Sequence, residues 1–195
     1  MSASVEKSEK KKKNGFVEEL YDWVETFVTA LVAVVLIFTF ICRIVAVDGQ
    51  SMMQTLEHRD SLIITNLGDV KAGDIVVFQQ IEDNYNAPLI KRVIATEGQT
   101  VDLDIDPVTG VLNISVDGKL IDEPYAYYDP ARRTYEPFIE FPLTVEKGHV
   151  LVLGDNRRNS KDSRSFGTID ERNIMGKVLL RLTPVSKFGK VEPVK

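Results

Sequence analysis

The sequence predicts a mostly β domain, barrel-like or sandwich-like, preceded by a single transmembrane α-helix. The first observation behind this prediction is an uncharged run over residues 26–42 that is apolar on every face. The second is a series of short runs after residue 46, rich in Val, Ile and Leu and separated by Gly, Asp, Asn and Pro. The third is that no helical periodicity appears in this later part of the chain.

The composition is typical of one globular domain with an appendage. The chain has 195 residues, 44 % of them hydrophobic, and a formal net charge of −5. This apolar fraction is sufficient for a core, and the charge gives no broad basic surface for a nucleic-acid partner. One cysteine, Cys42, and two histidines, His58 and His149, provide neither a disulfide within the chain nor a Cys/His metal set. We therefore expect no cofactor and no metal.

The N-terminal part predicts a cytoplasmic basic tail over residues 1–23 and a transmembrane signal anchor over residues 24–45. Residues 1–15 are polar and low in complexity, so we expect them to be disordered. The uncharged run is near the lower length limit for a bilayer span, and residues 44–47 can extend it. Because the lysines precede the run, the positive-inside rule places the N-terminus in the cytoplasm and residues 46–195 outside.

Two alternatives for the apolar run are a buried core helix and a cleaved secretory signal. A helix that packs on the core of a domain usually has one polar face, whereas this run is apolar on all faces. The best cleavage position of a secretory signal, after Ala46, would put the bulky Ile44 three residues before the cut. An uncleaved anchor is the interpretation that we favour.

The part after residue 46 is expected to contain seven main strands, over residues 62–65, 75–81, 89–96, 100–105, 111–116, 149–154 and 177–182. The pair Asp117-Gly118, which follows one of these runs, predicts a tight hairpin turn. Residues 97–147 carry prolines and tyrosines, and we expect them to form a small, less regular β insertion.

Two short segments could carry chemistry. Ser51 lies in DGQSMMQTL, where Gly49 permits a tight turn and a close approach of another chain. Lys91 lies in PLIKRVIA, where both faces of a strand are otherwise apolar, so that at least one of Lys91 and Arg92 is partly buried. A buried lysine has a lowered pKa, because desolvation disfavours the ammonium form, and a neutral amine can act as a base.

The segment GDNRRNSKDSRSFG, residues 154–167, concentrates hydrogen-bond donors and acceptors between two glycines after an apolar strand. Such a density predicts a rigid loop in which Asp162 and Arg164 can pair. Ser160 or Ser163 could hold a neighbouring amine in place.

Four segments, in chain order, resemble the sequence boxes of bacterial type I signal peptidases: GQSMMQTL, KAGDIVVF, LIKRVIA and GDNRRNSKDSRSFG. The preceding single anchor also resembles the Gram-positive type of this family. The resemblance implies a membrane-bound serine endopeptidase that removes N-terminal signal peptides from exported preproteins. It implies Ser51 as nucleophile and Lys91 as general base, acting through an acyl-enzyme. The supporting residues that it implies are Ser160, which would position the amine, and the structural pairs Asp155–Arg92 and Asp162–Arg164.

Two positions near Ser51 differ from residues that other members of this family carry. Some family members carry a hydroxyl-bearing oxyanion donor two residues before the serine, where this chain has Gly49. The family's serine box usually has proline three residues after the serine, and this chain has Gln54, which leaves the turn less restrained. Gln54 motivates the alternative of a non-catalytic relative that binds exported chains without cutting them.

The resemblance also implies substrates with small residues one and three positions before the cut. The expected partners are secretory preproteins, the lipid bilayer and the protein-export machinery. Ser51 follows Arg43 by so few residues that it lies at most about 28 Å from the end of the span. Candidates for the shallow apolar pockets that receive the substrate are Val47, Met52, Leu56, Leu89 and Ile90.

Three rival enzyme classes are less consistent with the sequence. A histidine-dependent serine hydrolase would need His58 or His149, which both lie in turn-like segments. The Ser-x-x-Lys pattern of penicillin-binding proteins occurs only in the N-terminal tail. A self-cleaving repressor would need a DNA-binding domain in front, and the Ala72-Gly73 pair lies between the two catalytic residues.

Overall fold

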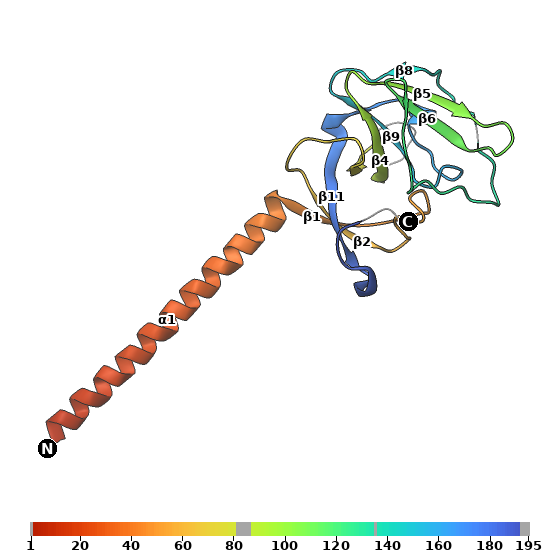
Figure 1. Ribbon diagram of the computed structural model, residues 1–195. Helices are drawn as coiled ribbons and strands as arrows, with labels where there is room; N and C mark the ends of the chain where they lie inside the picture. The colour runs from red at the N-terminus through yellow and green to blue at the C-terminus, as the bar shows by residue number, and fades with distance from the viewer. Residues whose placement is uncertain (1, 81–86, 135, 192–195) are drawn as a thin grey trace. The chain divides into compact units, whose positions relative to one another are not determined.

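The computed structural model describes residues 2–80, 87–134 and 136–191, and the side chains of residues 2–16 and 40 lie outside this description. By its internal contacts the chain divides into two compact units, Met1–Cys42 and Arg43–Lys195. The first unit contains the N-terminal helix, and the second contains the β structure (Figure 1).

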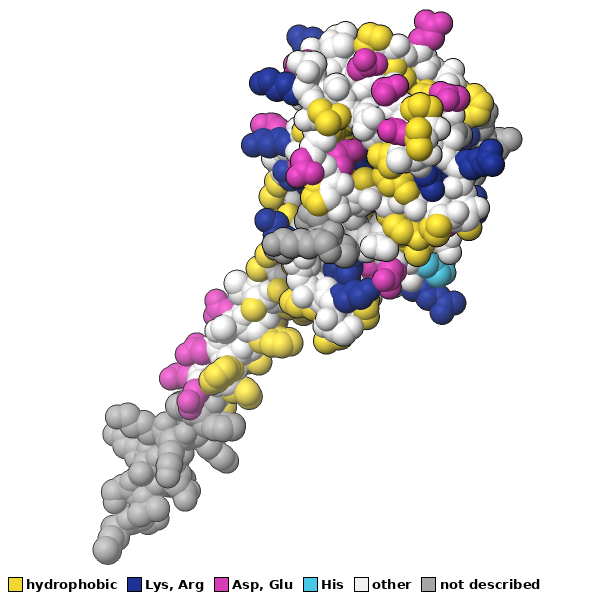
Figure 2. Space-filling view, turned by 45° about the vertical axis from the view of Figure 1, so that its right-hand side comes forward, with side chains coloured by type: hydrophobic (Ala, Val, Ile, Leu, Met, Phe, Trp, Pro, Cys, Tyr) yellow, Lys and Arg dark blue, Asp and Glu magenta, His cyan; other side chains and the backbone are white. Residues whose placement is uncertain are grey.

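Helix α1 spans Ser2–Phe40. Its segment Val17–Thr39 has a mean hydropathy of 1.8, is long enough to cross a membrane, and has an apolar window with no buried residue. Figure 2 shows hydrophobic side chains exposed along the described part of this helix. A helix that is apolar all round and has exposed apolar side chains fits a single-pass membrane anchor.

Two sequence-based expectations about this region are wrong. The polar tail is helical from Ser2, because it combines good helix formers with Glu–Lys spacings of four residues and has no proline. Residues 44–47 do not extend the span, because the helix ends at Phe40 and strand β1, Cys42–Ala46, begins directly afterwards. Ile44 and Val45 belong to β1, and Val47 directly follows it.

The larger sheet has seven strands in the order β1-β2-β11-β3-β4-β9-β10, curved into a half-barrel. Apart from β1, its strands are β2 Ser61–Thr65, β3 Ile75–Phe78, β4 Leu89–Thr96, β9 His149–Leu153, β10 Ile169–Asp170 and β11 Ile174–Thr183. The pairings from β2 to β10 are antiparallel. The prediction of a mostly β domain is confirmed, although β11 is longer than expected, and Ile81, the expected end of β3, lies outside the described residues.

The insertion forms a second, four-stranded sheet in the order β7-β6-β5-β8. Its strands are β5 Thr100–Ile105, β6 Leu112–Val116, β7 Lys119–Leu120 and β8 Leu143–Thr144. The predicted hairpin is present between β6 and β7, where both Asp117 and Gly118 have positive φ, at 52° and 75°. These angles fit the type I′ turn that best joins two antiparallel strands.

Three short helices complete the described structure: α2 Ser163–Phe166, η1 Glu171–Asn173 and η2 Val185–Lys187, the last two of the 3₁₀ type. Helix α2 begins at the N-cap residue Asp162, whose side chain accepts a hydrogen bond from the Arg164 backbone N–H.

Strand β4 is covered on both faces, and this determines where its side chains go. On one side Ile90 belongs to a hydrophobic cluster with residues of β2 and β3, and Ile94 belongs to another with Leu153 and residues of the four-stranded sheet. Val93, which alternates onto the same face as Lys91, belongs to a third cluster with residues of β3 and β9. Figure 1 shows the four-stranded sheet beside β4 and β9. A polar side chain in the buried middle of β4 is therefore shielded from water.

The cluster between the two sheets should contribute strongly to stability. Leu153 on β9 is fully buried there, whereas Leu120 on β7 is 68 % exposed. We expect Leu153→Ala to lower the free energy of unfolding by about 2–5 kcal/mol, because it removes buried methyl groups and leaves a cavity. Leu120→Ala, the matched control, should change it by less than about 0.5 kcal/mol. Urea unfolding followed by circular dichroism measures both, and equal losses would contradict this packing.

Candidate active site

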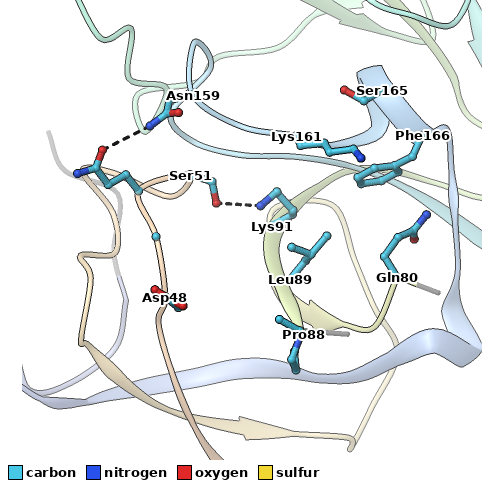
Figure 3. Close-up of a pocket in the computed structure, with 13 residues that line it drawn as sticks. Asp48, Ser51, Gln80, Pro88, Leu89, Lys91, Asn159, Lys161, Ser165 and Phe166 are labelled. Carbon is cyan, nitrogen blue, oxygen red and sulfur yellow. Dashed lines mark hydrogen bonds between the residues drawn. The ribbon is translucent and has the colours of Figure 1, made fainter. Parts of the chain in front are cut away.

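Ser51 and Lys91 are in direct contact, although they lie 40 residues apart in the chain. Lys91 Nζ donates a hydrogen bond to Ser51 Oγ over 2.8 Å, and another to the Ile90 carbonyl over 3.0 Å. Figure 3 shows the lysine extending from β4 toward the serine, which lies on the segment between β1 and β2. The structure thus brings together the two residues on which the sequence-based mechanism depends.

The amine of Lys91 is shielded from solvent, because only 2 % of the residue is exposed. Burial lowers its pKa from 10.5 to about 8, against the opposing effect of the Asp162 and Asp155 carboxylates, and the Arg164 guanidinium lowers it further. With this pKa roughly 10 % of the amine is neutral at pH 7, compared with roughly 0.03 % for an ordinary lysine. The site therefore provides a base in usable amounts near neutral pH.

Asp155 and Arg92 form a buried bidentate ion pair next to Lys91. Arg92 Nε and Nη2 donate to the two carboxylate oxygens over 2.9 and 2.6 Å. Arg92 also donates from Nη1 to the Gly73 carbonyl over 3.0 Å, and Thr55 Oγ1 donates to Asp155 Oδ2 over 2.5 Å. Because every charge here has a partner, the pair can lie in the interior without an uncompensated ion.

Asp162 and Arg164 form a second buried bidentate pair, with Nε and Nη2 each 2.8 Å from a carboxylate oxygen. Burial raises the pKa of Asp162, but hydrogen bonds and the charge of Arg164 outweigh it, so the pKa lies below its usual value. Asp162 also accepts a hydrogen bond from the Gly154 N–H over 3.0 Å, and Arg164 Nη1 donates to the Arg157 carbonyl over 2.8 Å. The pair thereby fixes the loop that follows β9.

Ser160 lies in this loop and is buried. Its hydroxyl hydrogen-bonds to the Asp162 carboxylate, which contributes to the low pKa of that group. A Cβ at Gly154 would lie 2.1 Å from Ser160 Oγ and 2.6 Å from the Ser51 carbonyl oxygen, so only glycine fits between them. That Ser160 positions the Lys91 amine stays a prediction.

The Ser51 segment is held by the loop after β9. The Asn156 N–H donates to the Ser51 carbonyl over 3.0 Å, and Asn156 Nδ2 donates to the Gln50 carbonyl over 3.1 Å. Among the described residues none accepts a hydrogen bond from the Ser51 N–H, which is left available for an oxyanion. Gly49 has a φ of +100°, a conformation that favours glycine over any hydroxyl-bearing residue. The Met53–Gln54 peptide bond is cis, and Gln54 is exposed.

Two pockets meet at the serine–lysine pair. The smaller, of about 250 Å³, is lined by Val47, Met52, Leu89 and Ile90 among other apolar residues. The larger, of about 390 Å³, also contains side chains that the sequence did not single out, including Gln80, Pro88, Asn159, Lys161, Ser165 and Phe166 (Figure 3). Leu56 was expected in a pocket, and this expectation is wrong: Leu56 is fully buried in the core beneath the serine segment.

The insertion supplies further supports that the sequence reasoning missed. Arg157 is fully buried and donates to both Glu123 carboxylate oxygens over 2.6 and 2.7 Å. The Tyr125 ring lies against the Arg92 guanidinium, 3.9 Å from ring centre to Cζ. Tyr127 exchanges backbone hydrogen bonds with Asp155 and Arg157. The only sequence signal for these contacts was the density of tyrosine and acidic residues in the segment DEPYAYYDP.

Among the described residues no hydrogen bond joins either histidine to Ser51 or Lys91. His58 Nδ1 accepts a hydrogen bond from the Gly49 N–H over 3.4 Å and is 3.3 Å from an oxygen of the exposed Asp48 carboxylate, and His149 Nδ1 is 3.1 Å from the Lys147 carbonyl. Neither is among the residues that line the two pockets at Ser51. This arrangement gives no support to a histidine-dependent hydrolase.

Two Asp-x-Arg sequences in which the aspartate and the arginine form an ion pair offer a direct test of burial. Asp162–Arg164 is fully buried, whereas Asp170–Arg172 has the same spacing and a side-chain exposure of 89 % at Arg172. We expect Asp162→Asn to lower the free energy of unfolding by about 3–5 kcal/mol, because it leaves a buried guanidinium uncompensated. Asp170→Asn should have little or no effect. Chemical unfolding of both variants measures this, and similar losses would contradict the structural role of the buried pair.

Comparison with known proteins identifies the family. A family model described as signal peptidase, peptidase S26, matches residues 20–183. Signal peptidase IB of Staphylococcus aureus is 34 % identical over 188 residues, covering 88 % of this chain and 93 % of that protein. A probable signal peptidase I-2 of Synechocystis sp. is 32 % identical over 200 residues, covering 97 % of this chain and 85 % of that protein.

A crystal structure of a signal peptidase I from Enterococcus faecalis V583 is 25 % identical, with a TM-score of 0.46 over 57 % of this chain and 98 % of that one. The family match includes both Ser51 and Lys91 and all four segments that resemble the sequence boxes. Because this match spans most of the chain and two relatives exceed 30 % identity over most of their length, the chain belongs to the signal peptidase I (S26) family of serine endopeptidases.

Proposed function

We propose that this chain removes N-terminal signal peptides from exported preproteins, with Ser51 as nucleophile and Lys91 as general base. The observation that carries the proposal is the 2.8 Å contact between Lys91 Nζ and Ser51 Oγ, made by an amine that is almost completely buried. A nucleophile hydrogen-bonded to a base of suitable pKa is the arrangement that covalent catalysis by serine requires.

The first half of the reaction forms an acyl-enzyme. Neutral Lys91 takes the proton of the Ser51 hydroxyl as Oγ bonds to the carbonyl carbon of the scissile peptide. The negative charge that develops on the carbonyl oxygen is stabilised by the Ser51 N–H. When the C–N bond breaks, the Lys91 ammonium gives its proton to the leaving amine, and the signal peptide remains bound to Ser51 as an ester.

The second half returns the enzyme to its starting state. Lys91, neutral again, takes a proton from a water molecule as its oxygen attacks the ester carbonyl. When the C–O bond to Ser51 breaks, the lysine returns the proton to Oγ. The signal peptide leaves with a new carboxyl terminus, and the enzyme again has a protonated Ser51 hydroxyl and a neutral Lys91.

Substrate selection is proposed to rest on the apolar pocket of about 250 Å³ beside the pair. Its walls are mainly apolar and include Val47, Met52, Leu89 and Ile90, while the charged residues Asp48 and Lys91 also line it. Small apolar residues near the cut, as implied by similarity to the family, would enter such a pocket at little cost of desolvation.

The anchor is proposed to hold the catalytic domain at the outer surface of the cell membrane, with the N-terminus in the cytoplasm. The basic residues before α1's apolar segment support this orientation through the positive-inside rule. The short connection from α1 to Ser51 keeps the nucleophile close to the outer surface of the bilayer. Preproteins that the export machinery delivers would present their scissile peptide bonds there.

Removal of either proposed catalytic group should abolish cleavage. We expect Ser51→Ala to reduce cleavage to background, and Lys91→Met to lower kcat/KM by roughly 10²–10⁴-fold or more, because each removes one partner of the proton transfer. The measurement is cleavage of a labelled preprotein by the detergent-solubilised chain.

Lys119→Met and His149→Ala are the matched controls and should keep full activity, because both residues are remote from the pockets. Cleavage that survives in Ser51→Ala or Lys91→Met would disprove the mechanism. Complete loss in His149→Ala would revive a histidine-dependent reaction. Absence of cleavage by the wild type, together with binding of the preprotein, would favour the non-catalytic alternative that Gln54 suggests.

The pH dependence of the reaction should follow the titration of Lys91. Its pKa is lowered to about 8, and only the neutral amine can accept the serine proton, so kcat/KM should rise about tenfold per pH unit below 8 and level off above it. The profile is measured with a preprotein-derived peptide between pH 6 and 10. A rate that stays constant across this range, or that levels off only near pH 10, would contradict a desolvated lysine base.

A further inference from the structure

Thr55 connects the serine segment to the interior of the domain. It follows Ser51 by four residues and is only 3 % exposed. Its hydroxyl donates a hydrogen bond to Asp155 Oδ2 over 2.5 Å. Because a buried hydroxyl is costly without a partner, this contact is well placed to fix the side chain and the backbone that carries it.

The backbone of Thr55 is held from the opposite side. Arg181 on β11 donates from Nη2 to the Thr55 carbonyl, and its Nε lies 3.0 Å from Asp60 Oδ2. Asp60 Oδ2 also accepts a hydrogen bond from the Glu57 N–H over 3.0 Å. Thr55 is therefore fixed between strand β11 and the loop after β9.

The partner of the Thr55 hydroxyl leads directly to the base. Asp155 receives two hydrogen bonds from Arg92, which follows Lys91 on β4. The next residue, Asn156, donates its N–H to the Ser51 carbonyl. The loop after β9 thus contacts the serine segment at Gln50, Ser51 and Thr55, and it also contacts β4, the strand that carries Lys91.

We propose that Thr55 is a positioning residue, whose hydroxyl holds the Ser51 segment at the distance from β4 at which Ser51 Oγ meets Lys91 Nζ. This inference rests on the proposed roles of Ser51 and Lys91. Without the hydroxyl, the segment keeps the hydrogen bonds to its Gln50, Ser51 and Thr55 carbonyls but loses the one that joins it to the Asp155–Arg92 pair, so its distance from β4 is less restrained. A displacement of about 1 Å between reacting groups can reduce a rate by about 10²-fold.

The test compares variants with and without the hydroxyl in the detergent-solubilised full chain. Thr55→Val removes the hydroxyl and keeps the shape, Thr55→Ala is a smaller hydroxyl-free variant, and Thr55→Ser keeps the hydroxyl. Thr65→Val is the matched control, because Thr65 is also buried and accepts a hydrogen bond from the Leu67 N–H, far from the Ser51 contacts described here. Circular dichroism establishes that each variant is folded.

We expect Thr55→Val and Thr55→Ala to lower kcat by roughly 10–100-fold with KM changed less than about twofold. Thr55→Ser should restore kcat to within about threefold of the wild type, and Thr65→Val should leave it unchanged. Wild-type kcat in both hydroxyl-free variants, an equal loss in Thr65→Val, or no restoration by serine would overturn the proposal.

A second readout separates this inference from the proposed function. The ¹³Cε signal of Lys91 in lysine-labelled protein, identified by its absence in Lys91→Met, reports the surroundings of the amine whether or not the protein cleaves. We expect this signal to shift or broaden in Thr55→Val and to stay unchanged in Thr55→Ser and Thr65→Val. If the wild type does not cleave but the signal responds in this way, the proposed function fails and the positioning role stands. An unchanged signal in Thr55→Val disproves the positioning role.

Discussion

The chemistry of this site depends on keeping one amine away from water while it touches a hydroxyl. Lys91 can be desolvated because β4 is covered on both faces: Ile90 and Ile94 belong to two of the hydrophobic clusters, and Val93, on the same face as Lys91, belongs to a third with residues of β3 and β9. Lowering the lysine pKa from 10.5 to about 8 costs folding free energy of about 3 kcal/mol at neutral pH, since the buried ammonium is disfavoured by that amount. The rest of the domain must supply this energy.

The charges around Lys91 are arranged so that burial remains the dominant effect. Asp155 and Asp162 both favour the ammonium, but each carboxylate is engaged by a bidentate arginine, Arg92 or Arg164. Unpaired carboxylates at the same positions would raise the pKa of Lys91, so that its amine would be protonated at neutral pH and could not accept a proton. The insertion contributes to this arrangement, because Tyr125 covers the Arg92 guanidinium and thereby limits the access of water to the pair.

Much of the fold was predictable because strands of this domain are short, apolar and bounded by turn residues. The runs at β4 and β5 have the predicted bounds, and the Asp117-Gly118 turn follows from the positive φ angles that these residues tolerate. Strand β1 was missed because an apolar β-branched segment directly after an apolar helix gives the same signal in either state. Leu56 was misassigned because hydrophobicity alone does not distinguish a pocket wall from a core.

The sequence by itself determined the class of the domain, the apolar N-terminal helix, and the choice of Ser51 and Lys91 as proposed nucleophile and base, because these depend on local patterns and on residue types that the chemistry requires. Only the tertiary structure decided that the two residues meet, how deeply the amine is buried, and which distant groups hold them. Glu123, Thr55 and Arg181 act through contacts between segments far apart in the chain, and such contacts leave no periodicity or spacing in the sequence. The desolvation of the Lys91 amine likewise depends on the packed domain, because other segments must cover both faces of the strand that carries it.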